Sequence, residues 1–250
     1  MIYYMILFIG MQFNYLNSET LVNESLEQQI GQDSLLRLNY DNLRYFYNNF
    51  NEFENITSVD ANYLSNINFD SLFTYLAKLP NLKHLNISRA NIENLSPKIA
   101  LLKNLETLIL IGNPIATLPD EFSNLTKLRY LNLTSCHINN LDSVLLTLQP
   151  VSSLKEIYLD DLQLLTFPNE LFNLKQLQII SVANNQIDFI PKDICNLVNL
   201  KYLLVNNNKF DTFPENIACL DLQVLQISTI AGRADSIENA FPKIKTIIWH

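Results

Sequence analysis

The sequence predicts an α/β repeat fold, a curved right-handed solenoid in which short parallel strands form a sheet on the concave side. Triplets of leucine-type residues with spacings of +3 and +2 recur along the chain. They begin at Leu82, Leu105, Leu128, Leu154, Leu177, Leu200, Leu222 and Ile244, so successive copies start 22, 23 or 26 residues apart. Self-similarity at such a period is typical of solenoids, in which stacked repeats share one continuous core.

Composition restricts the class of protein before any motif is considered. The chain has 250 residues, of which 48% are hydrophobic and 17% charged, so it can form a globular core. Its formal charge of −8 gives no reason to expect nucleic-acid binding, which needs a basic surface. Only 4 glycines are present, which argues against glycine-rich phosphate loops. We therefore expect no nucleic-acid partner and no cofactor.

Residues 1–18 begin with an apolar run, MIYYMILFIGMQF, that carries no charge. The run is too short to span a bilayer but suits the apolar region of a signal peptide. Against this, no Lys or Arg precedes it and no small-residue cleavage site follows. The other interpretation is an apolar strand or helix that closes the open end of the core. The two interpretations predict different cellular locations. If residues 1–18 are removed as a signal peptide, the protein is secreted or at the cell surface; if they are retained, it is cytoplasmic. No other segment is predicted to be transmembrane.

The remaining chain divides into a cap and a repeat domain. Residues 19–55 are predicted to form a helical N-terminal cap, because the first repeat would otherwise expose its core. Residues 56–250 are predicted to form about 8 repeats and a terminal strand, starting with a weak copy at Ile56. The last strand ends at Trp249, and an uncapped apolar edge is a liability. Either Trp249 shields the core, or the native chain associates there, or the chain is a fragment.

One repeat, residues 105–128, shows how the pattern works. Strand side chains alternate between the two faces of a sheet, so Leu108 and Leu110 point into the stack and Ile109 points out. Asn113 sits where the chain must turn away from the strand, and its amide can bond backbone groups of the turn and of the adjacent repeat. The "LP" at Leu118 then begins the return along the opposite side, where proline is tolerated.

These motifs resemble a known family. The segments LETLILIGNPI, LQIISVANNQI and LKYLLVNNNKF resemble the leucine-rich repeat consensus L-x-x-L-x-L-x-x-N-x-L. The tails TLPDEFSNL, TFPNELFNL, FIPKDICNL and TFPENIACL are similar to the 23-residue subclass that continues L-P-x-x-(apolar)-x-x-L. The resemblance covers roughly residues 56–249. It implies a non-catalytic scaffold that binds another protein through its concave face.

Departures from the consensus make further predictions. Four repeats replace the turn asparagine, with Ala90, Cys136, Leu162 and Ile230. Leu162 cannot form the side-chain hydrogen bonds, so the turns near it should be less regular. The longer repeat that begins at Leu128 lacks the L-P signal and is predicted to form a helical turn on the convex side.

The three cysteines do not form the framework of a small secreted domain. Cys195 and Cys219 lie 24 residues apart and could approach each other in a stack of repeats. We nevertheless expect no bridge, because a disulfide also requires a narrow Cβ geometry.

No arrangement for catalysis is found, and we expect no enzyme activity. The histidines His84, His137 and His250 fall in different repeats, and His84 and His137 are ~10 Å apart from strand spacing alone, so no metal site is expected. Nucleotide-binding and hydrolase motifs are missing from the sequence. Asp160 and Asp161, with Glu156 nearby, are interpreted as a solvated acidic spot, or else as recipients of a partner's Lys or Arg.

The outward strand positions are the candidate binding face. Several carry aromatic, apolar or titratable side chains: His84, Tyr130, Glu156, Tyr158, Ile179, Tyr202 and Leu204. Tyrosine-rich patches with apolar neighbours are typical of protein-recognition surfaces. The alternative is that these residues only favour strand formation.

A basic column borders this face at the strand entrance, comprising Lys83, Arg129, Lys155, Lys201 and Lys245. The ordinary interpretation is a solvated rim. The alternative is a weak, salt-sensitive attachment to an anionic partner, a glycan or another component of the cell envelope. The sequence therefore predicts a protein-binding scaffold, with a secreted or surface-attached glycan or envelope binder as the alternative.

Overall fold

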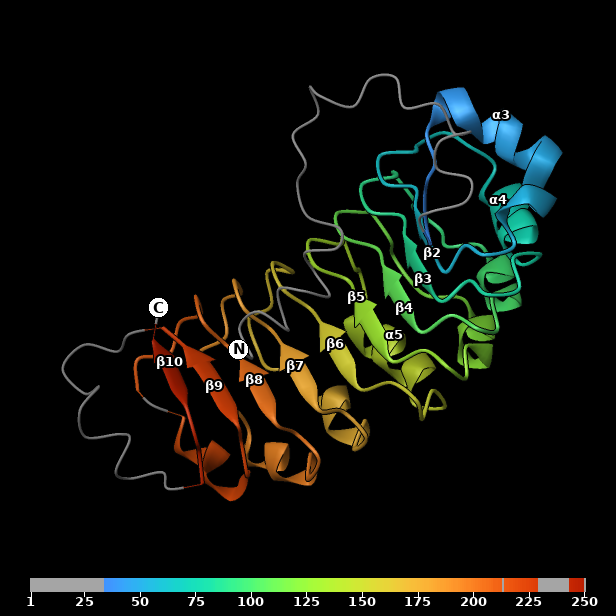
Figure 1. Ribbon diagram of the computed structural model, residues 1–250. Helices are drawn as coiled ribbons and strands as arrows, with labels where there is room; N and C mark the ends of the chain where they lie inside the picture. The colour runs from blue at the N-terminus through green and yellow to red at the C-terminus, as the bar shows by residue number, and fades with distance from the viewer. Residues whose placement is uncertain (1–33, 213, 229–242, 250) are drawn as a thin grey trace.

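The computed structural model describes residues 34–212, 214–228 and 243–249. Within them the strands form one sheet of ten parallel strands whose order follows the chain (Figure 1). The strands are β1 Leu35–Arg37, β2 Ser58–Asp60, β3 His84–Asn86, β4 Thr107–Ile109, β5 Tyr130–Asn132, β6 Glu156–Tyr158, β7 Ile179–Ser181, β8 Tyr202–Leu204, β9 Val224–Ile227 and β10 Ile247–Trp249. The predicted solenoid is confirmed.

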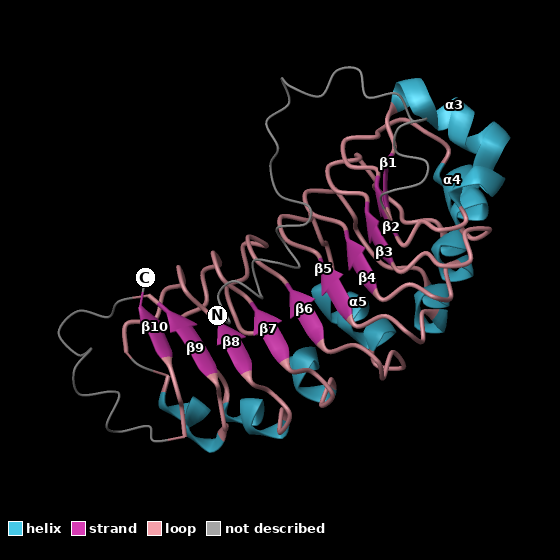
Figure 2. Cartoon of the chain, viewed as in Figure 1, coloured by secondary structure: helices cyan, strands magenta, loops and turns pink. Residues whose placement is uncertain are grey.

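Helical segments cover the convex side of the curved sheet (Figure 2). The α-helices are α3 Tyr40–Asn49, α4 Phe69–Leu76 and α5 Leu141–Leu148. Shorter 3₁₀ helices span Phe50–Phe53, Pro97–Leu101, Asp120–Asn124, Asn169–Asn173, Lys192–Asn196 and Glu215–Cys219. The helix α5 confirms the helical turn predicted for the longer repeat. Helix α4 occupies the same place between β2 and β3, where the strand spacing is also 26 residues, so three extra residues convert a 3₁₀ helix into an α-helix.

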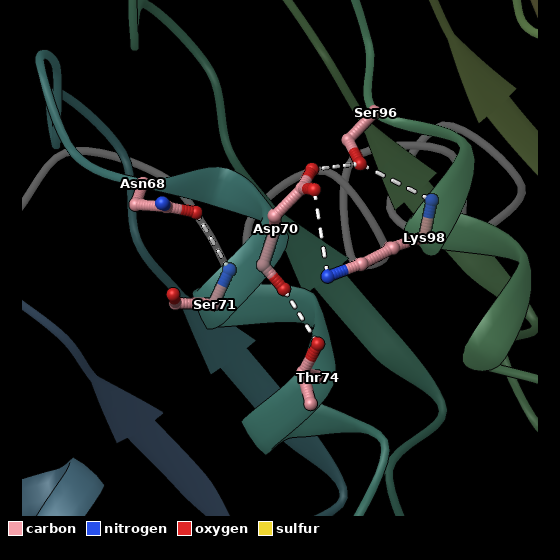
Figure 3. Close-up of polar contacts among 6 residues, drawn as sticks. All are labelled: Asn68, Asp70, Ser71, Thr74, Ser96 and Lys98. Carbon is pink, nitrogen blue, oxygen red and sulfur yellow. Dashed lines mark hydrogen bonds and ion pairs between the residues drawn. The ribbon is translucent and has the colours of Figure 1, made fainter.

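Polar side chains tie helix α4 to the next repeat (Figure 3). Asn68 caps the helix by accepting a hydrogen bond from the Ser71 amide at 2.8 Å. The Asp70 carboxylate accepts a hydrogen bond from the Ser96 hydroxyl and lies 3.4 Å from Lys98 Nζ. The Ser96 hydrogen bond, together with the positive charge of Lys98, lowers the pKa of Asp70. These contacts fix the register between helix α4 and the 3₁₀ helix Pro97–Leu101.

The core lies between the sheet and the convex segments. Leu108 and Leu110 of the β4 repeat are fully buried, as the alternation predicts. One continuous apolar cluster runs from Leu36 to Ile244. Each repeat therefore completes the core of its neighbour.

In seven repeats a left-handed residue begins the turn out of the sheet. It directly precedes the asparagine position of the consensus, and its φ lies between 52° and 67° in seven repeats: Tyr63, Arg89, Gly112, Ser135, Asp161, Asn184 and Asn207. At Gly112 a Cβ atom would come within 3.1 Å of Arg89 Cγ, so glycine also relieves crowding between repeats. The sequence pattern did not reveal this conformation, because most of the seven residues are not glycine.

The turn asparagines bond across the stack, as predicted. Asn113 Oδ1 accepts from the Ala90 and Ile92 amides at 3.0 and 3.1 Å. Its Nδ2 donates to the Ile87 and Leu110 carbonyls, both at 2.8 Å. The side chain is 1% exposed, so these bonds satisfy backbone groups that water cannot reach freely.

The repeats without asparagine use other solutions. Cys136 Sγ donates to the Leu110 carbonyl at 3.3 Å. Leu162 has no such side-chain bond, and its amide donates to Asn185 Oδ1 of the following repeat at 3.0 Å, as the Ala90 amide does to Asn113. The predicted irregularity near Leu162 is limited to Gln163, whose φ is 59°, and Asn91 after Ala90 shows the same departure with φ 55°.

The expectation of no bridge between Cys195 and Cys219 is wrong. Their sulfur atoms are bonded at 2.07 Å, and the Cα atoms are 5.7 Å apart. The two cysteines lie in consecutive 3₁₀ helices, Lys192–Asn196 and Glu215–Cys219, which stack on the convex side. Sequence spacing alone could not show that stacking brings the Cα atoms within bridging range.

The two ends of the solenoid are described only in part. Residues 34–55 supply strand β1 and helix α3, which begins with a capping box formed by Asn39 and Asn42. Trp249 and Ile247 of β10 are partly buried against the core. The apolar segment 1–18, residues 19–33 of the expected cap, Ile230 and His250 lie outside the described residues.

Candidate protein-binding face

The strand register brings most of the predicted binding residues together. Tyr130, Glu156, Ile179 and Tyr202 occupy equivalent positions on the consecutive strands β5 to β8. Tyr158 and Leu204 occupy the next outward position and are separated by Ser181 on β7. His84 lies farther away, on β3, where its Nδ1 contacts the Thr107 hydroxyl at 2.9 Å. The face is therefore centred on β5 to β8 without His84.

A second apolar cluster lies on this face, apart from the main core. We name Ile109, Tyr130 and Tyr158 the concave cluster, with Ile111 and Ile179 partly buried against it. The rings of Tyr130 and Tyr158 pack with centroids 5.0 Å apart. These tyrosines are only 8% and 9% exposed, because outward side chains of adjacent strands cover one another.

Two members of this arrangement were missed as candidate residues from the sequence. Ile109 and Ile111 follow the outward alternation, but neither was selected, because the pattern gives the direction of a side chain and not its contacts. The signal that could have found them is their position next to Tyr130 and Tyr158 on neighbouring strands.

Burial also shapes the electrostatics of the concave cluster. Burial raises the pKa of Tyr130 to about 12 and raises the pKa of Tyr158 further, with nearby Glu156 and Asp160 adding to both effects. The pKa of Glu156 is raised by burial, while its hydrogen bond with Tyr158 and the charge of Arg129 act in the opposite direction. Both tyrosines therefore stay neutral and can donate hydrogen bonds at physiological pH.

Asp160 does not match the expected solvated acidic spot, whereas Asp161 is exposed. Asp160 is partly buried, and this burial raises its pKa to about 6, with the charge of Asp161 as a further contribution. Asp160 Oδ1 accepts from the Ser181 hydroxyl and, at 2.8 Å, from the Ala183 amide. The difference arises because Asp160 continues the outward alternation of β6, whereas Asp161 is the left-handed turn residue.

The basic rim is partly neutralised by acidic neighbours. Lys83 Nζ lies 2.9 Å from Glu106 Oε1, and Lys201 Nζ lies 3.2 Å from Asp221 Oδ2. The hydrogen bond from Lys83 is the main cause of the lowered pKa of Glu106. Lys155 Nζ donates to the Gln176 carbonyl at 3.5 Å, and Arg129 and Lys245 are exposed.

The described part of the chain brings together no three His, Cys, Asp or Glu side chains that could hold a metal ion. None of the described helices is both long and apolar enough to cross a bilayer.

Comparisons with known proteins agree with this geometry. A family model described as a leucine-rich repeat region matches residues 49–189. No curated protein matches the sequence. Among solved structures, an internalin (inlF) of Listeria monocytogenes is 19% identical, with a TM-score of 0.52 over 80% of this chain and 62% of that one. Internalin C2 (inlC2) of the same organism is 18% identical, with a TM-score of 0.52 over 80% of this chain and 73% of that one.

At these identities the internalins share the fold, and this chain spans less than two thirds of the length of the first. The family model covers more than half of the 250 residues. The chain belongs to the leucine-rich repeat family.

Proposed function

We propose that this chain is a non-catalytic scaffold that binds another protein through the concave face of β5 to β8. The observation that carries the proposal is the concave cluster, an apolar assembly on the side of the sheet that faces away from the core. Leucine-rich repeats commonly serve as interaction scaffolds. Fold alone does not establish function, so the proposal depends on this surface.

The residues of the concave face differ in exposure, and we propose different roles for the buried and the exposed ones. Tyr130 and Tyr158 are mostly buried, so they serve as a rigid base that reduces the entropy lost on binding. Ile179, Tyr202 and Leu204 are more exposed and supply the contact area. Aromatic and apolar anchors of this kind carry most of the energy of protein interfaces, often about 2 kcal/mol each.

We also propose that the chain works in an oxidising compartment, outside the cytosol. The disulfide between Cys195 and Cys219 supports this location, because such bridges are rare in reducing compartments. Binding of a glycan or anionic envelope component has weaker support. Lys83 and Lys201 of the basic rim are already paired with acidic side chains, which reduces the charge available to an anion.

Site-specific cross-linking tests the proposed face. A photoreactive amino acid is placed at Leu204, on the concave face, and in a control at Val198, which is 72% exposed and precedes β8 outside that face. We expect one protein from the native source to be cross-linked through position 204 and not through position 198. Cross-linking of the same protein through 198 alone would contradict the proposal.

A further inference from the structure

Two side-chain hydrogen-bond acceptors lie just past the carboxyl ends of β6 and β8. The parallel ladder continues past the assigned strands, because the Asp161 amide donates to the Ala183 carbonyl at 3.1 Å and the Asn184 amide donates to the Asn206 carbonyl at 3.0 Å. Asp160, Ala183 and Asn206 therefore occupy equivalent positions on neighbouring repeats. Asp160 and Asn206 are separated by two strand spacings, ~10 Å. We name Asp160 and Asn206 the acceptor row.

The side-chain oxygen of Asn206 has no hydrogen-bond donor among the described residues. Its side chain is 92% buried, since it is 8% exposed, and Oδ1 has no hydrogen-bond partner in the described part of the chain. A buried acceptor without a donor is costly, and native proteins have few of them. The oxygen exposes less than 1 Å² in the free protein, so a partner's donor reaches and stabilises it once the Asn206 side chain turns towards the face on binding.

The Asp160 carboxylate also lacks a partner, in this case a positively charged one among the described residues. Both of its described hydrogen bonds end at Oδ1, from the Ser181 hydroxyl and the Ala183 amide. Among the described residues, the charged group that shifts the pKa of Asp160 is Asp161, whose negative charge raises it further. Tyr130 and Tyr158, the other titratable neighbours, are neutral at physiological pH. The carboxylate therefore lacks a described cation.

The spacing of the row excludes one kind of ligand. A single metal ion needs its oxygen ligands at about 2.0–2.6 Å, and acceptors on strands ~10 Å apart cannot converge on it without large rearrangement. A polypeptide can reach separate acceptors with several donors. Arginine is well suited to Asp160, because its planar guanidinium binds a carboxylate with two parallel hydrogen bonds and also stacks on aromatic rings such as that of Tyr158.

We infer that the acceptor row binds a basic segment of the partner protein, in which an arginine pairs with Asp160 and a second donor reaches Asn206. The apolar neighbours Tyr158 and Leu204, on the same strands, accept an apolar side chain of that segment. The net charge of −8 favours the approach of such a partner. This inference rests on the proposed function, which places the partner on the same face.

The test uses a display library of random twelve-residue peptides selected against the intact, oxidised protein. Peptides that also bind the Tyr202→Ala variant are discarded, so those retained bind the proposed face. We expect them to contain arginine, or less often lysine, beside an apolar residue. Replacing that arginine by citrulline, which has nearly the same shape without the charge, should weaken binding about thirtyfold.

Variants of the protein locate the contact. Asp160→Asn should weaken the selected peptide about thirtyfold and reduce the salt dependence of binding. The control Asp161→Asn alters an adjacent exposed carboxylate and should change affinity less than threefold. Asn206→Ala should weaken the peptide about tenfold without lowering the thermal midpoint, because the removed oxygen has no partner among the described residues of the free protein.

The outcomes separate the two proposals. Peptides that depend on Tyr202 but show no basic enrichment, and bind Asp160→Asn normally, would overturn the inference and leave the proposed function standing. Failure to select any peptide that depends on Tyr202 would contradict both.

Discussion

Replacing Asn185 by alanine tests the mechanism that holds the repeats together. Asn185 is 7% exposed, and its Oδ1 accepts from the Leu162 and Leu164 amides, both at 3.0 Å. Its Nδ2 donates to the Leu159 and Val182 carbonyls, also at 3.0 Å, and to the Ala183 carbonyl at 3.1 Å. Alanine removes all five bonds. Most of the lost stability comes from the Leu162 and Leu164 amides, because each buried donor left without a partner destabilises the folded protein by about 1–3 kcal/mol. Both are partly buried, so water compensates in part and the expected loss is about 2–3 kcal/mol.

The assay is equilibrium urea denaturation of the oxidised protein, with Asn199→Ala as a matched control. Asn199 is exposed and donates a single bond from its side chain, to the Lys175 carbonyl at 2.8 Å, so its replacement should cost less than about 1 kcal/mol. Equal slopes for the variants and the parent chain would show that the midpoints can be compared. If Asn185→Ala were no more destabilising than Asn199→Ala, the hydrogen bonds of the turn would not stabilise the stack.

Three further predictions follow from the same structure. Leu162→Asn should be neutral or stabilise by up to about 1 kcal/mol in urea denaturation, because the new amide offers an acceptor to the preceding repeat; a larger loss would show that packing of Leu162 matters more. Reduction of the Cys195–Cys219 bridge should lower the stability by about 3.5 kcal/mol on the chain-entropy account, and thiol titration in denaturant should rise from one thiol to three; three thiols without reductant would contradict the bridge. Asp160 has a folded-state pKa of about 6, above its ordinary value of 3.8, so its contribution to stability is present below pH 3.8 and lost as the pH rises through 6. Asp160→Asn should therefore be more stable than the parent at pH 7, by about 2 kcal/mol, and this advantage should shrink towards pH 4; a constant difference would contradict the raised pKa.

The fold and the turn chemistry could be predicted because each follows from spacing alone. Side chains of a strand alternate between the two faces of the sheet. Once the repeat is known to begin at Leu105, this alternation places Leu108 in the core. The asparagine position is similarly tied to the strand, which is why the bonds of Asn113 and the helix in the longer repeat could be expected before the structure was known.

Contacts between repeats were harder to predict, because they depend on distances that one repeat does not encode. The bridge between Cys195 and Cys219 requires the stacking of two convex 3₁₀ helices. The mutual burial of Tyr130 and Tyr158 depends on the packing of outward side chains across strands. That the Asn206 oxygen has no partner among the described residues depends on the positions of side chains from neighbouring repeats.

The central claim, that the concave face binds a protein, is tested most directly by one paired measurement on the partner identified by cross-linking. Its dissociation constant and the thermal midpoint of the chain are measured for Tyr202→Ala, with Phe189→Ala, 60% exposed in the segment between β7 and the 3₁₀ helix Lys192–Asn196, as the control. Because Tyr202 lies outside the core and is partly exposed, we predict a loss of about thirtyfold in affinity with a small change in midpoint, and no loss of affinity for Phe189→Ala. Unchanged affinity together with a lowered midpoint for Tyr202→Ala would show that this tyrosine stabilises the sheet and does not contact a partner.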